Sequence, residues 1–199
     1  MSDVRFGPGG IPDWLEPIVR FCSRCGSRLT FGAVADEERE RLSCPSCGFV
    51  SYVNPRLVVT TLPITDRGEV MLIRRGIEPG LGMWAQPGGF LEIDETVRDA
   101  AIRETLEETG LQVEPGAIIG LYSRLQAAVV VVAFEARIVG GTPAVTRESL
   151  ETKPFAPESI PWPEIAFETS IRALSDWVAA VRPDLPLPDP ATITRDFGG

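Results

Sequence analysis

Residues 89–111 read GFLEIDETVRDAAIRETLEETGL. At about 100° per residue on a helix, Glu104 and Glu108 lie within about 40° of each other, and Glu107 lies about 60° to the other side. Three ionised carboxylates this close repel one another strongly. A divalent cation removes that repulsion, and hard oxygen ligands suit Mg²⁺ or Mn²⁺.

The alternative interpretation is a solvated acidic helix face, the commonest use of a Glu-rich helix. On such a face, acidic residues tend to alternate with Lys or Arg at i,i+4. Glu104 and Glu108 are instead a like-charged i,i+4 pair. The preceding Pro87–Gly89 favours a tight irregular loop whose backbone can approach a ligand. Both features favour a metal site over a plain surface.

The same stretch resembles the signature box of the Nudix hydrolases, with every charged and glycine position of that pattern filled. Thr105 stands at a usually aliphatic position, where its methyl group can still pack inward. The resemblance implies an α/β fold, a Nudix-type α/β/α sandwich with a mixed sheet. It also implies hydrolysis of a nucleoside diphosphate linked to another moiety. Glu104 and Glu108 are then the principal Mg²⁺ ligands, Glu107 completes the cluster, and the backbone of Gly89 joins them.

The resemblance further implies orienting and proton-transfer roles. Glu95 and Arg103 are expected to pin the loop to the helix. The general base in relatives is a box glutamate or a carboxylate on a later loop or strand. Glu148 and Glu151, in the segment RESLE, are the late candidates, and we include Glu151 among the predicted catalytic residues. Their alternative interpretation is a pair of ordinary exposed glutamates at a strand edge.

All four cysteines occur in two pairs, Cys22/Cys25 and Cys44/Cys47, each followed by a glycine. Two such pairs at this spacing predict a tetrahedral four-thiolate Zn²⁺ site. Because no ligand position remains open, this zinc is expected to be structural. Disulfides would need an oxidising compartment, and a redox pair would need one low-pKa thiol at a helix start.

The composition narrows the class of protein. The 199 residues carry a formal charge of −9 and include no histidine. An acidic protein is a poor ligand for nucleic-acid phosphates, so a nucleic-acid partner is not expected. Without histidine, Ser-His and Cys-His nucleophile systems are excluded. The longest apolar run is too short to cross a bilayer, and the N-terminus does not read as a signal peptide, so we expect a cytoplasmic protein without membrane contact.

Composition and motifs together predict four segments: an N-terminal extension (1–20), a zinc ribbon (21–52), a Nudix hydrolase domain (53–182) and a disordered tail (183–199). Strands are expected at 56–64, 69–75, 118–124, 127–139 and 150–155. Helices are expected at about 96–109, ending at Gly110, and from Thr169 or Ser170 to about Val181. Arg74, Arg75 and Arg124 are candidates to bind phosphate, and Trp84, Phe90 and Tyr122 to stack on a ring or to fill the core.

The order of zinc ribbon, Asn54-Pro55 and hydrolase box is similar to two groups within the superfamily. The NADH pyrophosphatases carry Gln-Pro-Trp-Pro-Phe-Pro after the box, which does not occur here between Leu111 and Phe134. The plant FAD and ADP-ribose pyrophosphatases and their bacterial relatives share more motifs, although Ala127 replaces a proline of many ADP-ribose hydrolases. The small-molecule substrate is therefore expected to be ADP-ribose or FAD, with NADH or another dinucleotide as the alternative. A nucleotide-sensing regulator is a further alternative, and a homodimer is common in the family.

Overall fold

The computed structural model describes residues 19–190, which form two compact units. Within this range the smaller unit comprises residues 19–55 and 125–128, and the larger unit comprises 56–124 and 129–190. Nearly all of the predicted extension (1–20) and the last nine residues of the predicted tail lie outside the described residues.

The smaller unit is a three-stranded antiparallel sheet made of β1 (Thr30–Gly32), β2 (Arg41–Ser43) and β3 (Val50–Ser51). Each cysteine pair closes a tight turn, because Gly26 N–H donates to the Cys22 carbonyl at 2.8 Å and Gly48 N–H donates to the Cys44 carbonyl at 2.9 Å. Both glycines have φ near +70°, a conformation that residues with a side chain rarely adopt. Among the described residues of this unit, the buried apolar cluster consists of Cys22, Leu29 and Cys44.

The larger unit contains one seven-stranded sheet. Its strands are β4 (Arg56–Ile64), β5 (Val70–Arg75), β6 (Trp84–Ala85), β7 (Gly88–Phe90), β8 (Leu111–Arg124), β9 (Val129–Gly141) and β10 (Ser149–Phe155). The main strand order is β10-β5-β4-β9-β8, while β6 pairs with β5 and β7 pairs with β4. Strands β4 and β9 are parallel and the other pairs are antiparallel. The prediction of a mixed sheet is confirmed.

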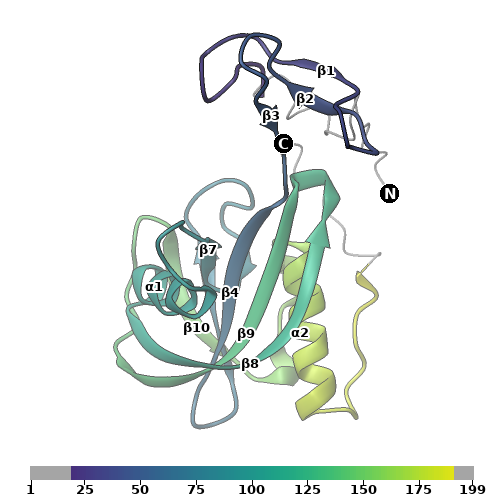
Figure 1. Ribbon diagram of the computed structural model, residues 1–199. Helices are drawn as coiled ribbons and strands as arrows, with labels where there is room; N and C mark the ends of the chain where they lie inside the picture. Colours follow the sequence, from purple (N-terminus) through teal and green to yellow (C-terminus); the bar gives the residue numbers. More distant parts are fainter. Residues whose placement is uncertain (1–18, 191–199) are drawn as a thin grey trace. The chain divides into compact units, whose positions relative to one another are not determined.

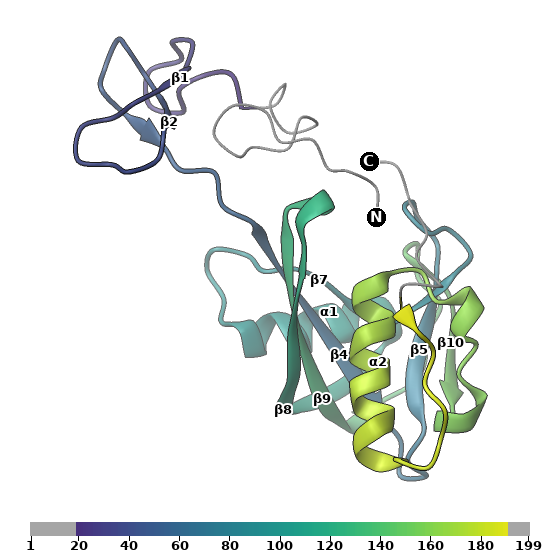
Figure 2. The same ribbon diagram turned by 90° about the vertical axis from the view of Figure 1, so that its right-hand side faces the viewer.

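Two helices cover the two faces of this sheet, α1 (Val97–Thr109) on one side and α2 (Glu168–Val181) on the other. Figures 1 and 2 show the helices separated by β4 and β9, so the predicted α/β/α sandwich is also confirmed. Within residues 19–190, short 3-10 turns occur at η2 (Leu125–Ala127), η3 (Pro157–Ser159) and η4 (Trp162–Glu164).

Alternate residues of β4 supply the two cores, as the two-residue period of a strand requires. Val59 packs with Ala100 and Ala101 of α1. Leu62, on the opposite face, packs with Leu174 and Trp177 of α2. Because β4 also pairs with β7, the loop before α1 is held against the centre of the sheet.

The start of β8 was predicted wrongly. The strand begins at Leu111, not at Ile118, and pairs with β9 over most of its length. The ladder shifts register between Pro115 and Ile118. Proline and the glycine after it made this stretch look like a connection, but a bulge in the ladder accommodates them.

The start of α2 also differs from the prediction. Phe167 is the N-cap and has no capping side-chain hydrogen bond. Thr169 and Ser170 are buried inside the helix, where packing overrides their preference for a cap. The predicted end of this helix at about Val181 agrees with the structure, where Val181 is its last residue. Among the residues described, no helix is long and apolar enough to cross a membrane.

Candidate active site and zinc site

Helix α1 begins and ends with local capping interactions. Asp99 N–H donates to Thr96 Oγ1 at 3.2 Å, and Thr96 N–H donates to Asp99 Oδ2 at 3.2 Å, which forms a capping box. At the other end Gly110 has φ of 72° and its N–H donates to the Leu106 carbonyl at 2.9 Å. These caps fix which residues of the acidic stretch face the sheet.

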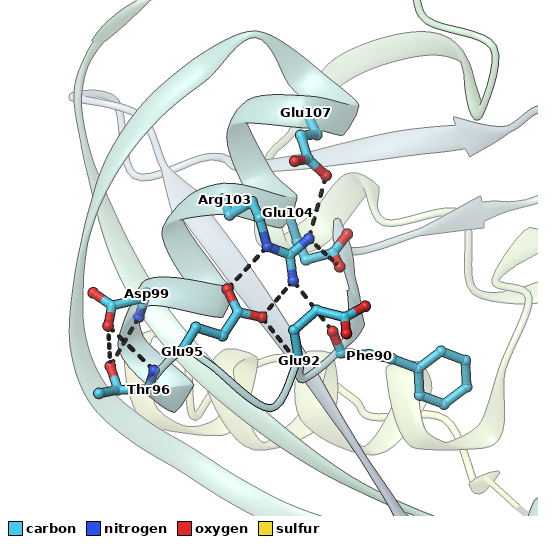
Figure 3. Close-up of polar contacts among 8 residues, drawn as sticks. All are labelled: Phe90, Glu92, Glu95, Thr96, Asp99, Arg103, Glu104 and Glu107. Carbon is cyan, nitrogen blue, oxygen red and sulfur yellow. Dashed lines mark hydrogen bonds and ion pairs between the residues drawn. The ribbon is translucent and has the colours of Figure 1, made fainter.

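Arg103 links helix α1 to the loop that precedes it (Figure 3). Its Nε and Nη2 donate to the two carboxylate oxygens of Glu95 at 2.9 and 2.6 Å, a bidentate pair. Nη2 also donates to the Phe90 carbonyl at 3.2 Å. Nη1 donates to Glu104 Oε1 at 2.7 Å and to Glu107 Oε2 at 3.3 Å. Hydrogen bonds from Arg103 lower the pKa of Glu95 to about 2.

Glu108 is the most buried of the three box glutamates, with 6% of the residue exposed. Its Oε2 accepts a hydrogen bond from Gly88 N–H at 2.8 Å. Burial raises the pKa of Glu108 to about 7, and the negative charges of Glu104 and Glu148 add to this rise. A buried carboxylate that remains ionised is destabilising unless a positive charge lies close to it.

Glu104 lies directly against Gly89. A Cβ atom on Gly89 would stand 2.4 Å from Glu104 Oε1 and 2.6 Å from Oε2, so only glycine leaves room for this carboxylate. The Glu104 side chain is 14% exposed, and burial raises its pKa against the opposing effect of Arg103. Glu104 and Glu108 therefore border the same two residues, Gly88 and Gly89, which begin β7 and which we call the glycine loop.

Glu107 lies apart from this pair. Its side chain is 59% exposed and contacts Arg103. Within residues 19–190, the oxygens of Glu104, Glu107 and Glu108 do not gather within 4.8 Å of one another. The helix therefore presents two carboxylates to the glycine loop and a third to Arg103 at the surface.

Two further charged residues lie within electrostatic reach of Glu108. Burial lowers the pKa of the Arg75 guanidinium, and the charges of Glu108 and Glu148 oppose that effect. Arg75 Nε donates to the Pro79 carbonyl at 2.8 Å, and its guanidinium lies 4.9 Å from the Phe167 ring centroid.

Glu148, just before β10, and Glu151, within β10, have different surroundings. Glu148 raises the pKa of both Glu104 and Glu108, and its carbonyl accepts from Gly76 N–H at 2.8 Å. Glu151 lies opposite Arg74, with the closest side-chain atoms 4.0 Å apart and 47% of its side chain exposed.

The aromatic candidates divide between core and surface. Trp84 and Tyr122 belong to the core on the α2 side. Phe90 is 43% exposed, and the Arg56 guanidinium lies 4.4 Å from its ring centroid. Of the three, Phe90 alone has an exposed ring beside the predicted site. Arg124 ends β8 and is partly buried.

Thr105 is fully buried in α1, on the side that faces β4. Its hydroxyl lies 2.6 Å from the Thr61 hydroxyl of β4 and donates to the Ala101 carbonyl at 2.6 Å. The Thr105 hydroxyl, at a position that is usually aliphatic, therefore has hydrogen-bond partners inside the core. This buried pair attaches the middle of α1 to the central strand.

The four cysteine sulfurs of the smaller unit lie within 4.8 Å of one another. The Cys22 and Cys47 sulfurs are 3.7 Å apart, and those of Cys25 and Cys44 are 3.4 Å apart. A tetrahedron with zinc–sulfur bonds of about 2.3 Å has edges of about 3.8 Å. All four thiols are free of disulfides. The donor set and its spacing fit Zn²⁺.

Comparison with known families agrees with this geometry. Residues 54–178 match the NUDIX domain family model, and residues 20–53 match the Nudix N-terminal model, a zinc ribbon. The chain belongs to the NUDIX family. The predicted family, fold and class of enzyme, a Nudix hydrolase behind a zinc ribbon, are confirmed.

Several known proteins are similar to this Nudix chain. A NUDIX hydrolase from Nitrosomonas europaea has a TM-score of 0.76 and 32% identity, over 85% of this chain and 96% of that one. An ADP-ribose pyrophosphatase from Methanocaldococcus jannaschii is 31% identical over 121 residues, 59% of this chain and 70% of that protein. The NAD-capped RNA hydrolase NudC of Chromobacterium violaceum is 37% identical over 95 residues, 48% of this chain. That match spans only 34% of NudC.

The two loop glycines lead to different expected outcomes. In Gly88→Ala the new Cβ would meet the Val59 carbonyl oxygen at 2.2 Å and Thr60 Cα at 2.6 Å. Because this is backbone, we expect a loss of about 2–3 kcal/mol in the free energy of unfolding, measured in urea. Gly89→Ala meets only the Glu104 carboxylate, so stability should be kept while activity falls about 10- to 100-fold. Equal stability of the two variants would contradict this assignment.

The raised pKa of Glu108 predicts a pH dependence. A proton competes with a cation for the same oxygens, so metal affinity should fall up to about tenfold per pH unit below pH 7 and level off above it. Without metal, this group's contribution to stability is fully present below its ordinary value of 4.5 and is lost as pH rises to about 7. Calorimetric Mg²⁺ titrations between about pH 6 and pH 8 measure the first effect. A flat affinity profile would be inconsistent with it.

Proposed function

We propose that this Nudix protein hydrolyses the pyrophosphate bond of ADP-ribose or FAD and releases AMP, with Mg²⁺ or Mn²⁺ as the metal. The observation that carries the proposal is the placement of Glu104 and Glu108. Both carboxylates border Gly88–Gly89, and burial raises the pKa of each.

The residues present fit a divalent cation. Two mutually repelling carboxylates, Glu108 buried and Glu104 half-buried, form a hard oxygen donor set beside Gly88–Gly89. Glu104, Glu108 and the carbonyl of Gly89 would hold the ion, and Glu107 stays a predicted additional ligand. When bound, such an ion neutralises charge on the diphosphate and acidifies the attacking water.

The chain's own residues supply orientation. Arg103 fixes the loop through Glu95 and the Phe90 carbonyl, and it holds one oxygen of Glu104. Arg75 brings a positive charge that acts on Glu108, and its Nε donates to the Pro79 carbonyl. We propose that Arg75 contacts a substrate phosphate, because a guanidinium matches phosphate geometry.

The general base is tested by a matched pair of variants. Glu148→Gln should lower kcat about 10²- to 10⁴-fold, because Glu148 is the late glutamate that affects Glu104 and Glu108 electrostatically. Glu151→Gln changes the same functional group three residues further along the chain, where Glu151 lies opposite Arg74. We expect near-normal kcat for it. The reverse order of the two rates would restore Glu151, the residue predicted from sequence.

The substrate proposal is supported by the sequence resemblance and by the similarity to an ADP-ribose pyrophosphatase. The second candidate is an NAD-type dinucleotide or an NAD-capped RNA, because several similar proteins are named NAD-capped RNA hydrolase NudC. This candidate is less favoured because the chain lacks the Gln-Pro-Trp-Pro-Phe-Pro segment that the NADH pyrophosphatases carry after the box. FAD rests on the sequence resemblance alone.

One assay separates these substrates. The purified chain is incubated with Mg²⁺ and, in turn, ADP-ribose, FAD, NADH, diadenosine polyphosphates and oxidised dNTPs, and products are identified by mass spectrometry. Release of AMP from ADP-ribose or FAD, abolished by Glu108→Gln, is the expected result. Faster cleavage of NADH would favour the second candidate. Inertness toward all five substrates would support a nucleotide-sensing regulator instead.

We also propose that the four cysteines bind one structural Zn²⁺, and that the protein forms a homodimer in the cytoplasm. The zinc proposal is supported by the spacing of the sulfurs. The dimer rests on the family resemblance, and sedimentation of the purified chain tests it.

A further inference from the structure

Positive charge in this acidic protein is concentrated in one short segment. Residues 19–35 contain three arginines, Arg20, Arg24 and Arg28, and no acidic residue. The whole chain has 19 basic and 28 acidic residues. The remainder of the chain therefore has 16 basic and 28 acidic residues, a formal charge of −12 against +3 for this segment.

The three arginines are exposed and carry no partner in the described part of the chain. None of their side chains forms a hydrogen bond or an ion pair there, in contrast to Arg41 of the same ribbon, which pairs with Glu37 at 3.3 Å. Among the side chains of residues 19–190, none therefore compensates their positive charge.

An exposed aromatic ring lies in the same segment, directly opposite one of these arginines. Phe21 is 64% exposed and forms an antiparallel bridge with Arg28, so the two residues are direct neighbours across the loop. Arg20 is held on the same loop, because its carbonyl accepts from Leu29 N–H at 2.9 Å. Arg24 lies in the turn between Cys22 and Cys25, the first cysteine pair. We call Arg20, Phe21, Arg24 and Arg28 the knuckle face.

We propose that the knuckle face binds single-stranded nucleic acid. Guanidinium groups bind phosphates by paired hydrogen bonds, and an exposed aromatic ring stacks on any base. Because the remainder of the chain is strongly negative, a polyanion is repelled elsewhere and directed to this face. The expectation against nucleic acid used the net charge of the whole chain, and that average conceals the local reversal of sign.

This binding is independent of the proposed hydrolysis, because it involves no residue of the box. The direct test is fluorescence anisotropy of the full-length, zinc-loaded protein with a labelled single strand of about 12 nucleotides, as RNA and as DNA, without Mg²⁺. Replacing Arg20, Arg24 and Arg28 together by Gln should remove about two units from the slope of log K against log salt. Phe21→Ala should weaken binding by about five- to a hundred-fold at constant salt.

Matched controls separate this face from a general effect of charge. Arg39→Gln alters an exposed arginine of the same ribbon that stands between Glu38 and Glu40, and it should bind like the wild type, whereas Arg24→Gln should not. A second triple variant, Arg67→Gln/Arg137→Gln/Arg172→Gln, changes the net charge by the same three units and should also bind like the wild type.

Loss of binding in the knuckle variants, with unchanged zinc content and unchanged ADP-ribose hydrolysis, supports the proposal. The proposal is overturned by equal losses in both triple variants, by no binding of either RNA or DNA at low salt, or by preferential binding to anionic lipid vesicles.

Discussion

Glu108→Gln is expected to reduce turnover by about 10²-fold or more while the fold and the zinc content are unchanged. The amide oxygen of glutamine can still accept the hydrogen bond from Gly88 N–H. What disappears is a buried negative charge that a metal ion needs as its ligand. Steady-state kinetics with saturating Mg²⁺ measure the effect.

Glu107→Gln provides the control for this variant. Glu107 is one residue away in sequence, carries the same charge and is exposed beside Arg103. Its replacement should have a smaller effect than that of Glu108. Near-normal turnover in Glu108→Gln, or a larger loss in Glu107→Gln, would contradict the assignment of the metal ligands.

Loss of a zinc ligand is expected to unfold the ribbon. Zinc binding contributes an apparent 10–16 kcal/mol, roughly, to small zinc domains at neutral pH. The ribbon's few buried residues cannot replace that contribution. In Cys44→Ala, backbone amides of residues 20–52 should therefore exchange hydrogen rapidly. Amides of β4 and β9, which belong to a separate compact unit with its own core, should stay protected.

Ser46→Ala is the matched control, because it lies in the same turn between Cys44 and Cys47 without offering a sulfur. Its exchange pattern and zinc content should equal those of the wild type. If Cys44→Ala kept the ribbon protected, the metal would not be what holds this unit together.

The features predictable from sequence are those that neighbouring residues determine. The span of β4 follows from a β-branched run, and the end of α1 at Gly110 follows from the freedom of glycine at positive φ. The convergence of the four sulfurs follows from two short turns of known geometry. The fold was predicted from the resemblance of residues 89–111 to the Nudix signature box, whose many fixed positions make such a match specific.

The remaining features depend on contacts between distant segments. Arg103 was predicted to pair with Glu95, but its additional bonds to Glu104 and Glu107 depend on the side chain's actual path. Sequence offered both Glu148 and Glu151 as late candidates and placed Glu151 among the predicted catalytic residues, whereas in the structure Glu151 lies opposite Arg74 and Glu148 is the one that affects Glu108.

Other such features lie in the core and at the edge of the sheet. The hydroxyl contact between Thr61 and Thr105 joins residues 44 positions apart. The bulged start of β8 is set by β9. No local pattern contains this information.

The central claim is that Glu104 and Glu108 together hold a catalytic divalent ion at the glycine loop. Anomalous diffraction from crystals soaked with Mn²⁺ tests it most directly. If Glu104 and Glu108 bind the ion, a manganese peak is expected within bonding distance of both carboxylates and of the Gly89 carbonyl. A peak bound elsewhere, with Glu104 and Glu108 still held only by Arg103 and Gly88 N–H, would contradict it.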